Sequence, residues 1–174
     1  YLDPQLPDAA SYRELRLQSP MRVFSADGAF IAEFGDRRRI LLDLEDMPET
    51  YVQAVLNTED KRFYSHGGVD IVTFVKAVGR LLVLGNDGPG GSTITMQLAR
   101  NVSLSFEKTI LRKAKEIILA LKLEQEFTKD EILELYLNAV FFGKRAYGSE
   151  AAAQTYYGKS LEELSVAQWA MLAG

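Results

Sequence analysis

The sequence predicts a mainly α-helical fold preceded by a short β-hairpin, and three observations support this class. After residue 47, apolar residues recur almost throughout at spacings of three and four, which is the period of an amphipathic helix. Within residues 21–35, two β-rich runs flank Asp27-Gly28, a dipeptide typical of a hairpin turn. The glycine-rich segment 85–92 is the one pronounced break in the helical pattern.

Each element follows from the local pattern in turn. Residues 1–20 contain three prolines and little periodicity, so an irregular arm is expected before the hairpin. The helices expected after the hairpin span residues 49–62, 69–85, 93–102, 107–126, 129–142, 148–157 and 165–173. We therefore expect an arm and hairpin over residues 1–47 and a helical domain over 48–174. Since the chain stops within an apolar helical pattern, we expect this domain to be truncated at its C-terminal end.

The composition excludes several classes of function. The net charge is −4, so the chain as a whole does not suit nucleic acid, and no nucleic-acid partner is expected. No cysteine is present, which excludes disulfides, thiol catalysis and cysteine-ligated metals. The single histidine, His66, excludes zinc sites built from several histidines. No signal peptide opens the chain, and the most apolar run, 69–85, is short for a transmembrane span and carries Lys76 and Arg80.

The expected helix 49–62 carries a carboxylate within its apolar stripe. The stripe continues through the residues just after the helix and consists of Val52, Val55, Leu56 and Phe63. Glu59 falls in the middle of this stripe and Asp60 near its edge. Burying an unpaired charge is costly, so either Glu59 is paired within the core or the stripe borders a cleft. Pairing for structure alone and a catalytic role are the two interpretations.

The segment after the glycine-rich break has the features of an anion site. Ser92 follows two glycines and suits a helix N-cap, and the N-terminus of a helix attracts anions such as phosphate. Thr93, Gln97, Arg100 and Asn101 are spaced by three and four and so share one polar face. The alternative is a loop followed by an ordinary cap.

The expected helix 107–126 carries a second carboxylate among apolar residues. Its most regular apolar face consists of Ile110, Ala114, Ile117 and Leu121, widened by Leu111 and Ile118. Arg112 and Glu116 are four residues apart and can pair. Apolar residues also flank Glu116, so we expect this helix to be buried and Glu116 to lie on a wet seam within it.

These features together favour a reaction on a phosphorylated sugar. From Arg100 to Lys115 there are five basic residues and one acidic residue, and such a local patch suits a phosphate or diphosphate. Paired carboxylates are common in glycosyl chemistry, and a diphosphate leaving group is stabilised by positive charge. From the residues alone, this reaction is one option among several.

Five segments in order resemble the signatures of the family 51 peptidoglycan glycosyltransferases. They are EDKRFYSHGG (59–68), GGSTITMQLARN (90–101), RKAKE (112–116), KDEILELYLN (129–138), and the run from RAYG (145–148) through AAAQTYYGKS to LSVAQWAMLAG. Each signature alone is weak, but the ordered set covers residues 59–174. The arm and hairpin resemble the segment that precedes this domain in bifunctional, class A penicillin-binding proteins.

This resemblance implies a lysozyme-like, two-lobed helical domain that polymerises lipid II. In the family the growing glycan on undecaprenyl diphosphate is the donor, lipid II is the acceptor, and transfer inverts the anomeric centre. The resemblance also implies contact with the membrane surface and a transpeptidase domain in the same full-length chain. The location implied is the outer face of the bacterial cytoplasmic membrane, with an anchor in a segment missing here. Helix 69–85 and the loop after it, expected to order when ligand binds, would form the membrane-facing lobe.

The resemblance also assigns roles to individual residues. Glu59 matches the general base, and Glu116 matches a second glutamate near the donor diphosphate and a divalent cation such as Mg²⁺. Arg112 and Lys113 match the groups that stabilise the diphosphate. The donor-site strip, where the inhibitor moenomycin also binds, is matched by Ser92, Thr93, Gln97, Arg100 and Asn101. The supporting residues of the first signature are matched by Asp60, Phe63 and His66.

The last two signatures are expected to be mostly scaffold. In the fourth, Thr128 should cap a packing helix in which Tyr136 and Asn138 hold neighbours in place. In the fifth, Gly148 should allow close helix packing, and Arg145 is the only residue expected to contact the substrate.

Three departures from the family pattern stand out. Met96 replaces a common glutamine, Arg100 a common lysine, and Gln168 a common glutamate. The family also continues past residue 174 with a lysine that reaches the donor site. Two alternatives to a polymerase stay open: a lytic enzyme that cleaves glycan with Glu59 as general acid, and a non-catalytic glycan- or lipid-binding module.

Overall fold

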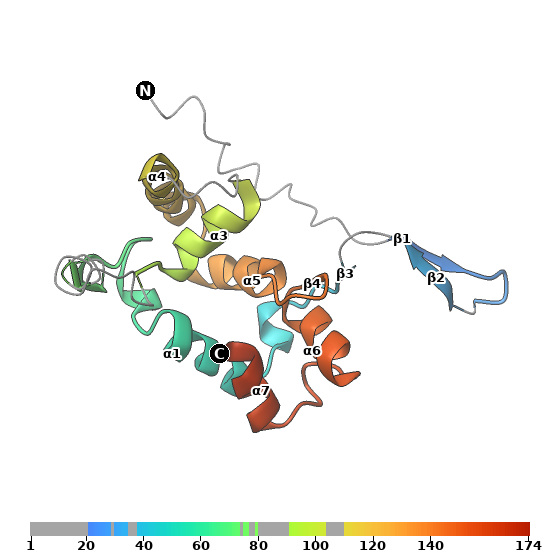
Figure 1. Ribbon diagram of the computed structural model, residues 1–174. Coiled ribbons are helices and arrows are strands. Elements are labelled where there is room, and N and C mark those ends of the chain that lie inside the picture. Colours follow the sequence, from blue (N-terminus) through green and yellow to red (C-terminus); the bar gives the residue numbers. More distant parts are fainter. Residues whose placement is uncertain are drawn as a thin grey trace.

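The computed structural model is mainly helical, with a β-hairpin at its N-terminal side, as predicted (Figure 1). It describes residues 21–28, 30–34, 38–73, 75, 76, 79, 91–103 and 110–174. The elements in chain order are β1 (Met21–Phe24), β2 (Phe30–Phe34), β3 (Arg38–Arg39), the 3₁₀ helix η3 (Leu44–Asp46), α1 (Glu49–Glu59), the 3₁₀ helix η4 (Phe63–Ser65), α3 (Ile94–Ser103), α4 (Ile110–Glu126), α5 (Lys129–Ala139), β4 (Ala146–Tyr147), α6 (Ser149–Tyr157) and α7 (Val166–Ala173). The arm predicted at 1–20 and most of the glycine-rich segment 85–92 lie outside the described residues.

The hydrophobic core lies where α1, α3, α4, α5 and α7 meet. Helix α3 packs on both α4 and α5, and α1 packs on α7 (Figure 1). The largest side chains buried at this junction include Tyr51, Ile94, Leu98, Leu133 and Leu137. Each lies on the apolar face of its helix, so burial of these faces explains why the helices assemble.

The three N-terminal strands differ in the strands with which they pair. Strands β1 and β2 pair antiparallel and extend away from the helices, with Gly28 in the turn at φ +83°, a conformation that glycine adopts readily (Figure 1). Strand β3 instead pairs in parallel with β4. Just after β3, Leu42 exchanges two hydrogen bonds with the side chain of Asn138 on α5. The segment between the hairpin and α1 is therefore fastened to the helical domain, and Asn138 holds a neighbouring segment as expected.

Two predicted helices end three residues early. Helix α1 stops at Glu59 because Asp60 is extended, with φ −157° and ψ 78°, and its carboxylate accepts a hydrogen bond from the backbone N–H of Ile94. Helix α5 likewise ends at Ala139, because Val140 adopts an extended conformation. After α5 the chain turns along the cavity described below, which Val140, Phe141 and Phe142 line, whereas the turn after α1 does not line it.

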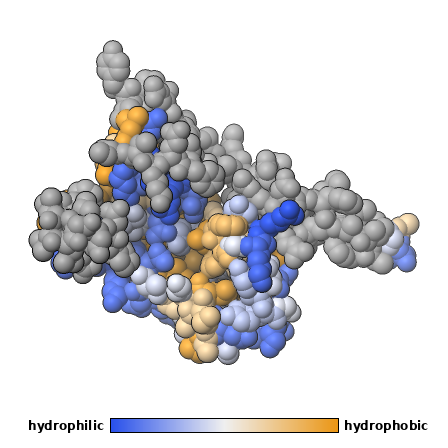
Figure 2. All heavy atoms as spheres, viewed as in Figure 1, coloured by the Kyte–Doolittle hydropathy of each residue, from blue (hydrophilic) through white to orange (hydrophobic). Residues whose placement is uncertain are grey.

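The prediction that helix α4 is buried was wrong for one of its faces. The side that packs into the protein carries Glu116, Leu119, Ala120 and Leu123. Leu111 and Leu121, from the face expected to be buried, are 53% and 45% exposed, and hydrophobic atoms are visible on α4 in Figure 2. A helix that is apolar nearly all round gives no periodic signal for its buried side, so the contact with α3 decides it.

The cap at Thr128 and the close packing at Gly148 follow the predictions, and α7 has a capping box that was not predicted. Thr128 and Glu131 form a reciprocal capping box at the start of α5. Gln168 accepts from the backbone N–H and the hydroxyl of Ser165, so the amide supplies the cap of α7 where the family commonly has glutamate. A Cβ on Gly148 would lie 2.8 Å from the backbone oxygen of Asn138, so α6 can approach α5 only with glycine here.

The second predicted helix is described only in part. Residues 71–73, 75, 76 and 79 are helical, and Asp70 caps their first turn by accepting from the backbone of Val72 and Thr73. Ile71 and Val75 are 72% and 61% exposed. No helix in the described part of the chain is long and apolar enough to span a membrane.

Candidate functional site

Glu59 lies at the edge of a cavity of about 220 Å³ between α1, α3, α5 and α7. The side chain is half-buried at the last position of α1. The apolar part of the cavity wall includes Val55, Leu137, Val140, Phe141, Phe142 and Leu172. Of the two interpretations of the apolar stripe of α1, the structure agrees with the one in which the stripe borders a cavity.

Three side chains from three helices meet in this cavity. Gln97 on α3 donates a hydrogen bond from Nε2 to Oε2 of Glu59, at 2.7 Å. Tyr136 on α5 donates from its hydroxyl to Oε1 of the same glutamine, at 3.3 Å. Burial, strengthened by the charge of Glu59, raises the pKa of Tyr136 well above its usual range, so its hydroxyl remains a donor. Tyr136 was expected only in the scaffold, because in a periodic pattern a tyrosine reads as one more apolar residue.

Three residues that follow α1 hold its end against the start of α3, namely Asp60, Phe63 and His66. Oδ2 of Asp60 accepts from the backbone N–H of Ile94 at 3.1 Å, and Nε2 of His66 lies 2.9 Å from the same oxygen. Because the partner is a carboxylate, Nε2 carries the proton. The ring of Phe63 is buried and meets His66 edge to face. The three residues thus brace the start of α3 against the end of α1, and none of them lines the cavity.

The cap of α3 is Thr93 and not Ser92 as predicted. Helix α3 begins at Ile94, and Thr93 Oγ1 accepts from the backbone N–H of Met96, as an N-cap does. The same hydroxyl donates to the backbone oxygen of Gly68 at 2.6 Å. Thr93 is therefore buried, and its hydroxyl is occupied by two hydrogen bonds within the fold. Gln97, from the same predicted polar strip, lines the cavity instead.

A cluster of opposite charges lies at the other side of α3. Glu116 is only 1% exposed, and its two oxygens are paired with Arg112 and with Lys113 Nζ, the latter at 2.9 Å. Lys113 also donates to Ser92 Oγ at 2.7 Å. Ser92 stands just before α3 and Gln97 one turn into it, so α3 connects this charge cluster with the cavity of Glu59. The predicted pairing of Arg112 with Glu116 is confirmed.

The remaining predicted residues are exposed. Arg100 and Asn101 project from the last turns of α3 toward solvent. Arg145 is exposed in a turn closed by a hydrogen bond from Ala146 N–H to the oxygen of Gly143, and its φ of 64° is uncommon for a residue with a side chain. This turn follows Phe142, a residue of the cavity wall, so Arg145 stands beyond the wall and does not line it.

The residues at Glu116 do not fit a metal held by the protein. Both oxygens of its carboxylate are already engaged by cations. Among the described residues, no group of three or more histidine, aspartate or glutamate side chains is arranged to hold a metal. Mg²⁺ is bound through oxygen ligands. A cation next to Glu116 would therefore need oxygen ligands from groups other than the described side chains. The divalent cation stays a prediction, and no step below depends on it.

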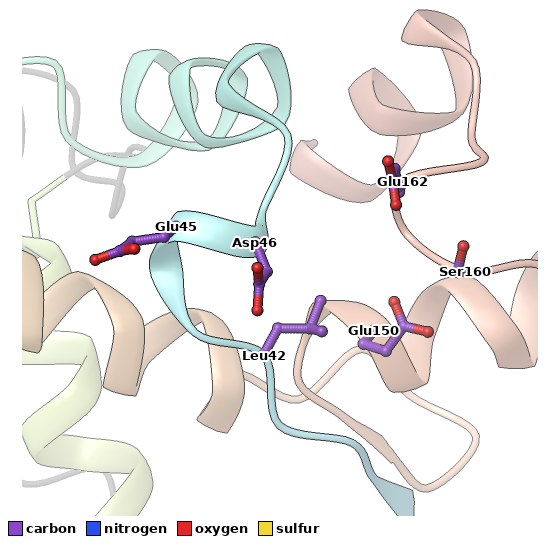
Figure 3. Close-up of a pocket in the computed structure, with 6 residues that line it drawn as sticks. All are labelled: Leu42, Glu45, Asp46, Glu150, Ser160 and Glu162. Atoms are coloured by element: carbon purple, nitrogen blue, oxygen red, sulfur yellow. The ribbon is translucent and has the colours of Figure 1, made fainter.

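A second, larger cavity of about 470 Å³ has a different character (Figure 3). Carboxylates from η3, α6 and the loop before α7 line it, namely Glu45, Asp46, Glu150 and Glu162. Glu150 is buried and accepts from the backbone N–H of Leu161 and from Gln154, so it holds that loop to α6. The negative charge of these carboxylates repels a phosphorylated ligand. This cavity is therefore not our candidate site, although it is the larger of the two.

The sequence is similar to known proteins over most or all of its length. A family model described as transglycosylase matches residues 27–174. Penicillin-binding protein 1A of Escherichia coli strain K12 is 51% identical over the whole chain, and the Pseudomonas aeruginosa protein of the same name is 49% identical. The chain spans about a fifth of the length of these relatives. A crystal structure of penicillin-binding protein 1A from Haemophilus influenzae aligns with 90% of this chain and 14% of that one, at 30% identity and a TM-score of 0.42.

Proposed function

This chain belongs to the transglycosylase family, and on that premise we propose that it polymerises lipid II into glycan strands and releases undecaprenyl diphosphate. The observation that carries the proposal is the carboxylate of Glu59. It lies at the edge of a largely apolar cavity, with one oxygen held by Gln97. Within the part of the chain that the structure describes, its other oxygen has no hydrogen-bond partner, so it can receive a proton from a bound sugar hydroxyl.

The chemistry needs a base on one side of the reacting carbon and positive charge on the other. Glu59 takes the proton of the acceptor's 4-hydroxyl while the oxygen of that hydroxyl attacks the anomeric carbon of the donor. The diphosphate leaves from the opposite face of this carbon. Lys113 and Arg112 stabilise the charge that develops on the leaving diphosphate, with Ser92 as a further polar contact. Glu116 holds both cations in place through its two oxygens.

Further proposals concern the protein as a whole. The exposed apolar residues Ile71, Val72 and Val75, with Lys76 beside them, suit a surface that rests on anionic lipid headgroups. We place the domain on the periplasmic side of the cytoplasmic membrane, anchored by another segment and joined to a transpeptidase domain. Moenomycin is expected to compete for the cluster of Ser92, Arg112 and Lys113.

The test is to incubate the full-length protein with labelled lipid II and to separate the products by size. Moenomycin-sensitive glycan polymer supports the proposal. Release of short muropeptides from purified sacculi, without polymer, would identify a lytic enzyme instead. Saturable binding of lipid II with neither product would identify a binding module. The charge cluster disfavours the lytic alternative, because hydrolysis of a neutral glycan has no use for a diphosphate site.

A further inference from the structure

We propose that Tyr136 is a positioning residue for the catalytic base and acts through Gln97. This inference rests on the proposed function, because it assigns Glu59 as the base. Tyr136, Gln97 and Glu59 come from α5, α3 and α1 and are joined in one direction, from phenol to amide to carboxylate. Nothing in the spacing of the sequence connects the phenol of Tyr136 with Glu59, which is 77 residues away.

The amide of Gln97 can be oriented in two ways, and only one suits an ionised base. With NH₂ toward Glu59, it donates to the carboxylate, as the structure has it. If the amide were flipped, its oxygen would face the carboxylate, and two acceptors would repel each other. A donor at the other end of the amide therefore favours the productive orientation, and the hydroxyl of Tyr136 is that donor.

Tyr136 is suited to this task for two reasons. Its side chain is buried, so water competes little for its hydroxyl. The high pKa of its phenol keeps the proton in place at any pH at which an enzyme works. The result is that one oxygen of Glu59 is held by Gln97, while the other stays available to the acceptor hydroxyl. At 3.3 Å, the bond of Tyr136 is long for an O–H donor, so its effect should be smaller than that of Gln97.

Tyr51 provides a matched control. Its buried ring borders the same cavity, but its hydroxyl donates to Ser149 Oγ at 2.8 Å and not to Gln97. Ser149 in turn donates to the backbone oxygen of Leu137, so this chain of bonds joins α6 to α5 and leaves Glu59 aside. Tyr51→Phe and Tyr136→Phe thus each remove one buried hydroxyl and keep the ring, and only the second removes a hydrogen bond to Gln97.

The experiment measures single-turnover glycosyl transfer by the full-length protein. Tyr136→Phe should lower the rate of the bound complex by about 3- to 10-fold, as expected for one lost hydrogen bond, with donor affinity unchanged. Tyr51→Phe should keep the wild-type rate. In a Gln97→Leu background, Tyr136→Phe should cost nothing more, because the residue that carries its effect is gone. A rate for Tyr136→Phe within twofold of wild type, or an equal loss in both backgrounds, would overturn the inference.

A second measurement separates this inference from the proposed function. In NMR spectra of the folded protein, the side-chain NH₂ signals of Gln97 should change in Tyr136→Phe and in Glu59→Gln, but not in Tyr51→Phe. That result, together with absence of polymer from the wild type, would remove the proposed function and keep the positioning contact. Unchanged Gln97 signals in Tyr136→Phe would remove the inference, whatever the activity.

Discussion

Glu59 and Glu116 stand on either side of α3 and are held in opposite ways. Glu59 is half-buried at the edge of a cavity and accepts a single hydrogen bond from a neutral amide. Glu116 is buried, and each of its oxygens is paired with a cation. Both oxygens of Glu116 are thus engaged, whereas one oxygen of Glu59 has no hydrogen-bond partner among the described residues.

On the proposed function, this contrast separates two electrostatic tasks within one domain, namely proton transfer at Glu59 and stabilisation of the diphosphate at Arg112 and Lys113. The base must be able to gain a proton during the reaction, so its surroundings contain no paired cation among the described residues. The diphosphate site must keep its geometry as charge develops, so its cations are fixed in advance by a buried anion. Each of the following changes tests one side of this comparison.

The largest effect is expected from Glu59→Gln. The amide keeps the shape but cannot accept the proton, so polymerisation should fall at least about 10²-fold. Helical content and binding of moenomycin should stay as in the wild type, as measured by circular dichroism and fluorescence titration. Polymer formed by this variant at a rate within tenfold of wild type would show that Glu59 is not the base.

Glu116→Gln should affect binding as well as rate. Without the buried anion, Arg112 and Lys113 are no longer held, so donor affinity should fall about tenfold, the usual scale for a lost charge-assisted contact. Equilibrium binding of moenomycin and single-turnover rates, measured separately, check this. If Glu116→Gln bound the donor normally while Glu59→Gln lost binding, the two roles would have to be exchanged.

Lys113→Gln tests the exposed part of the charge cluster. Lys113 contacts both Glu116 and Ser92, so its loss should weaken binding of a diphosphate lipid by about 5- to 10-fold and make that binding less sensitive to salt. Lys115→Gln is the matched control, because it removes the same charge from another side of α4. Equal losses in both variants would point to the general charge of α4 and not to a site at Ser92.

The smallest effect on activity is expected at Asp70, a carboxylate outside the site that is hydrogen-bonded to Arg62 and Thr73. Burial alone would raise its pKa, but hydrogen bonds from Thr73 and the pairing with Arg62 outweigh this and lower the pKa to about 2. A carboxyl with a lowered pKa stabilises the fold above its unfolded pKa of about 4, and this contribution is lost as the pH falls from about 4 to 2.

Asp70→Asn should therefore lower the free energy of unfolding by about 1–2 kcal/mol at pH 7 and by progressively less toward pH 2. Denaturant unfolding of both proteins across this range measures the difference. Transfer activity at pH 7 should hardly change, in contrast with the two glutamates. A constant difference at all pH values would mean that Asp70 acts through shape and not through its charge.

Much of the fold was predictable because its signals are local. The hairpin around Asp27-Gly28, the helical class and the cap at Thr128 each depend on residues within a few positions of one another. The position of Glu59 in an apolar stripe, and the reach of Arg112 to Glu116, also follow from the geometry of single helices.

Tertiary structure alone decided the remaining features, since they depend on contacts between distant segments. The buried side of α4 could not be read from a helix that is apolar nearly all round, and contact with α3 selected the face of Glu116. Helix α1 ends at Glu59 because the next carboxylate is drawn to a backbone N–H of α3, 34 residues away. Tyr136 reaches the base through Gln97 only because α5 and α1 meet across one cavity. Periodicity specifies which side of a helix can be buried, but a partner decides what that side touches.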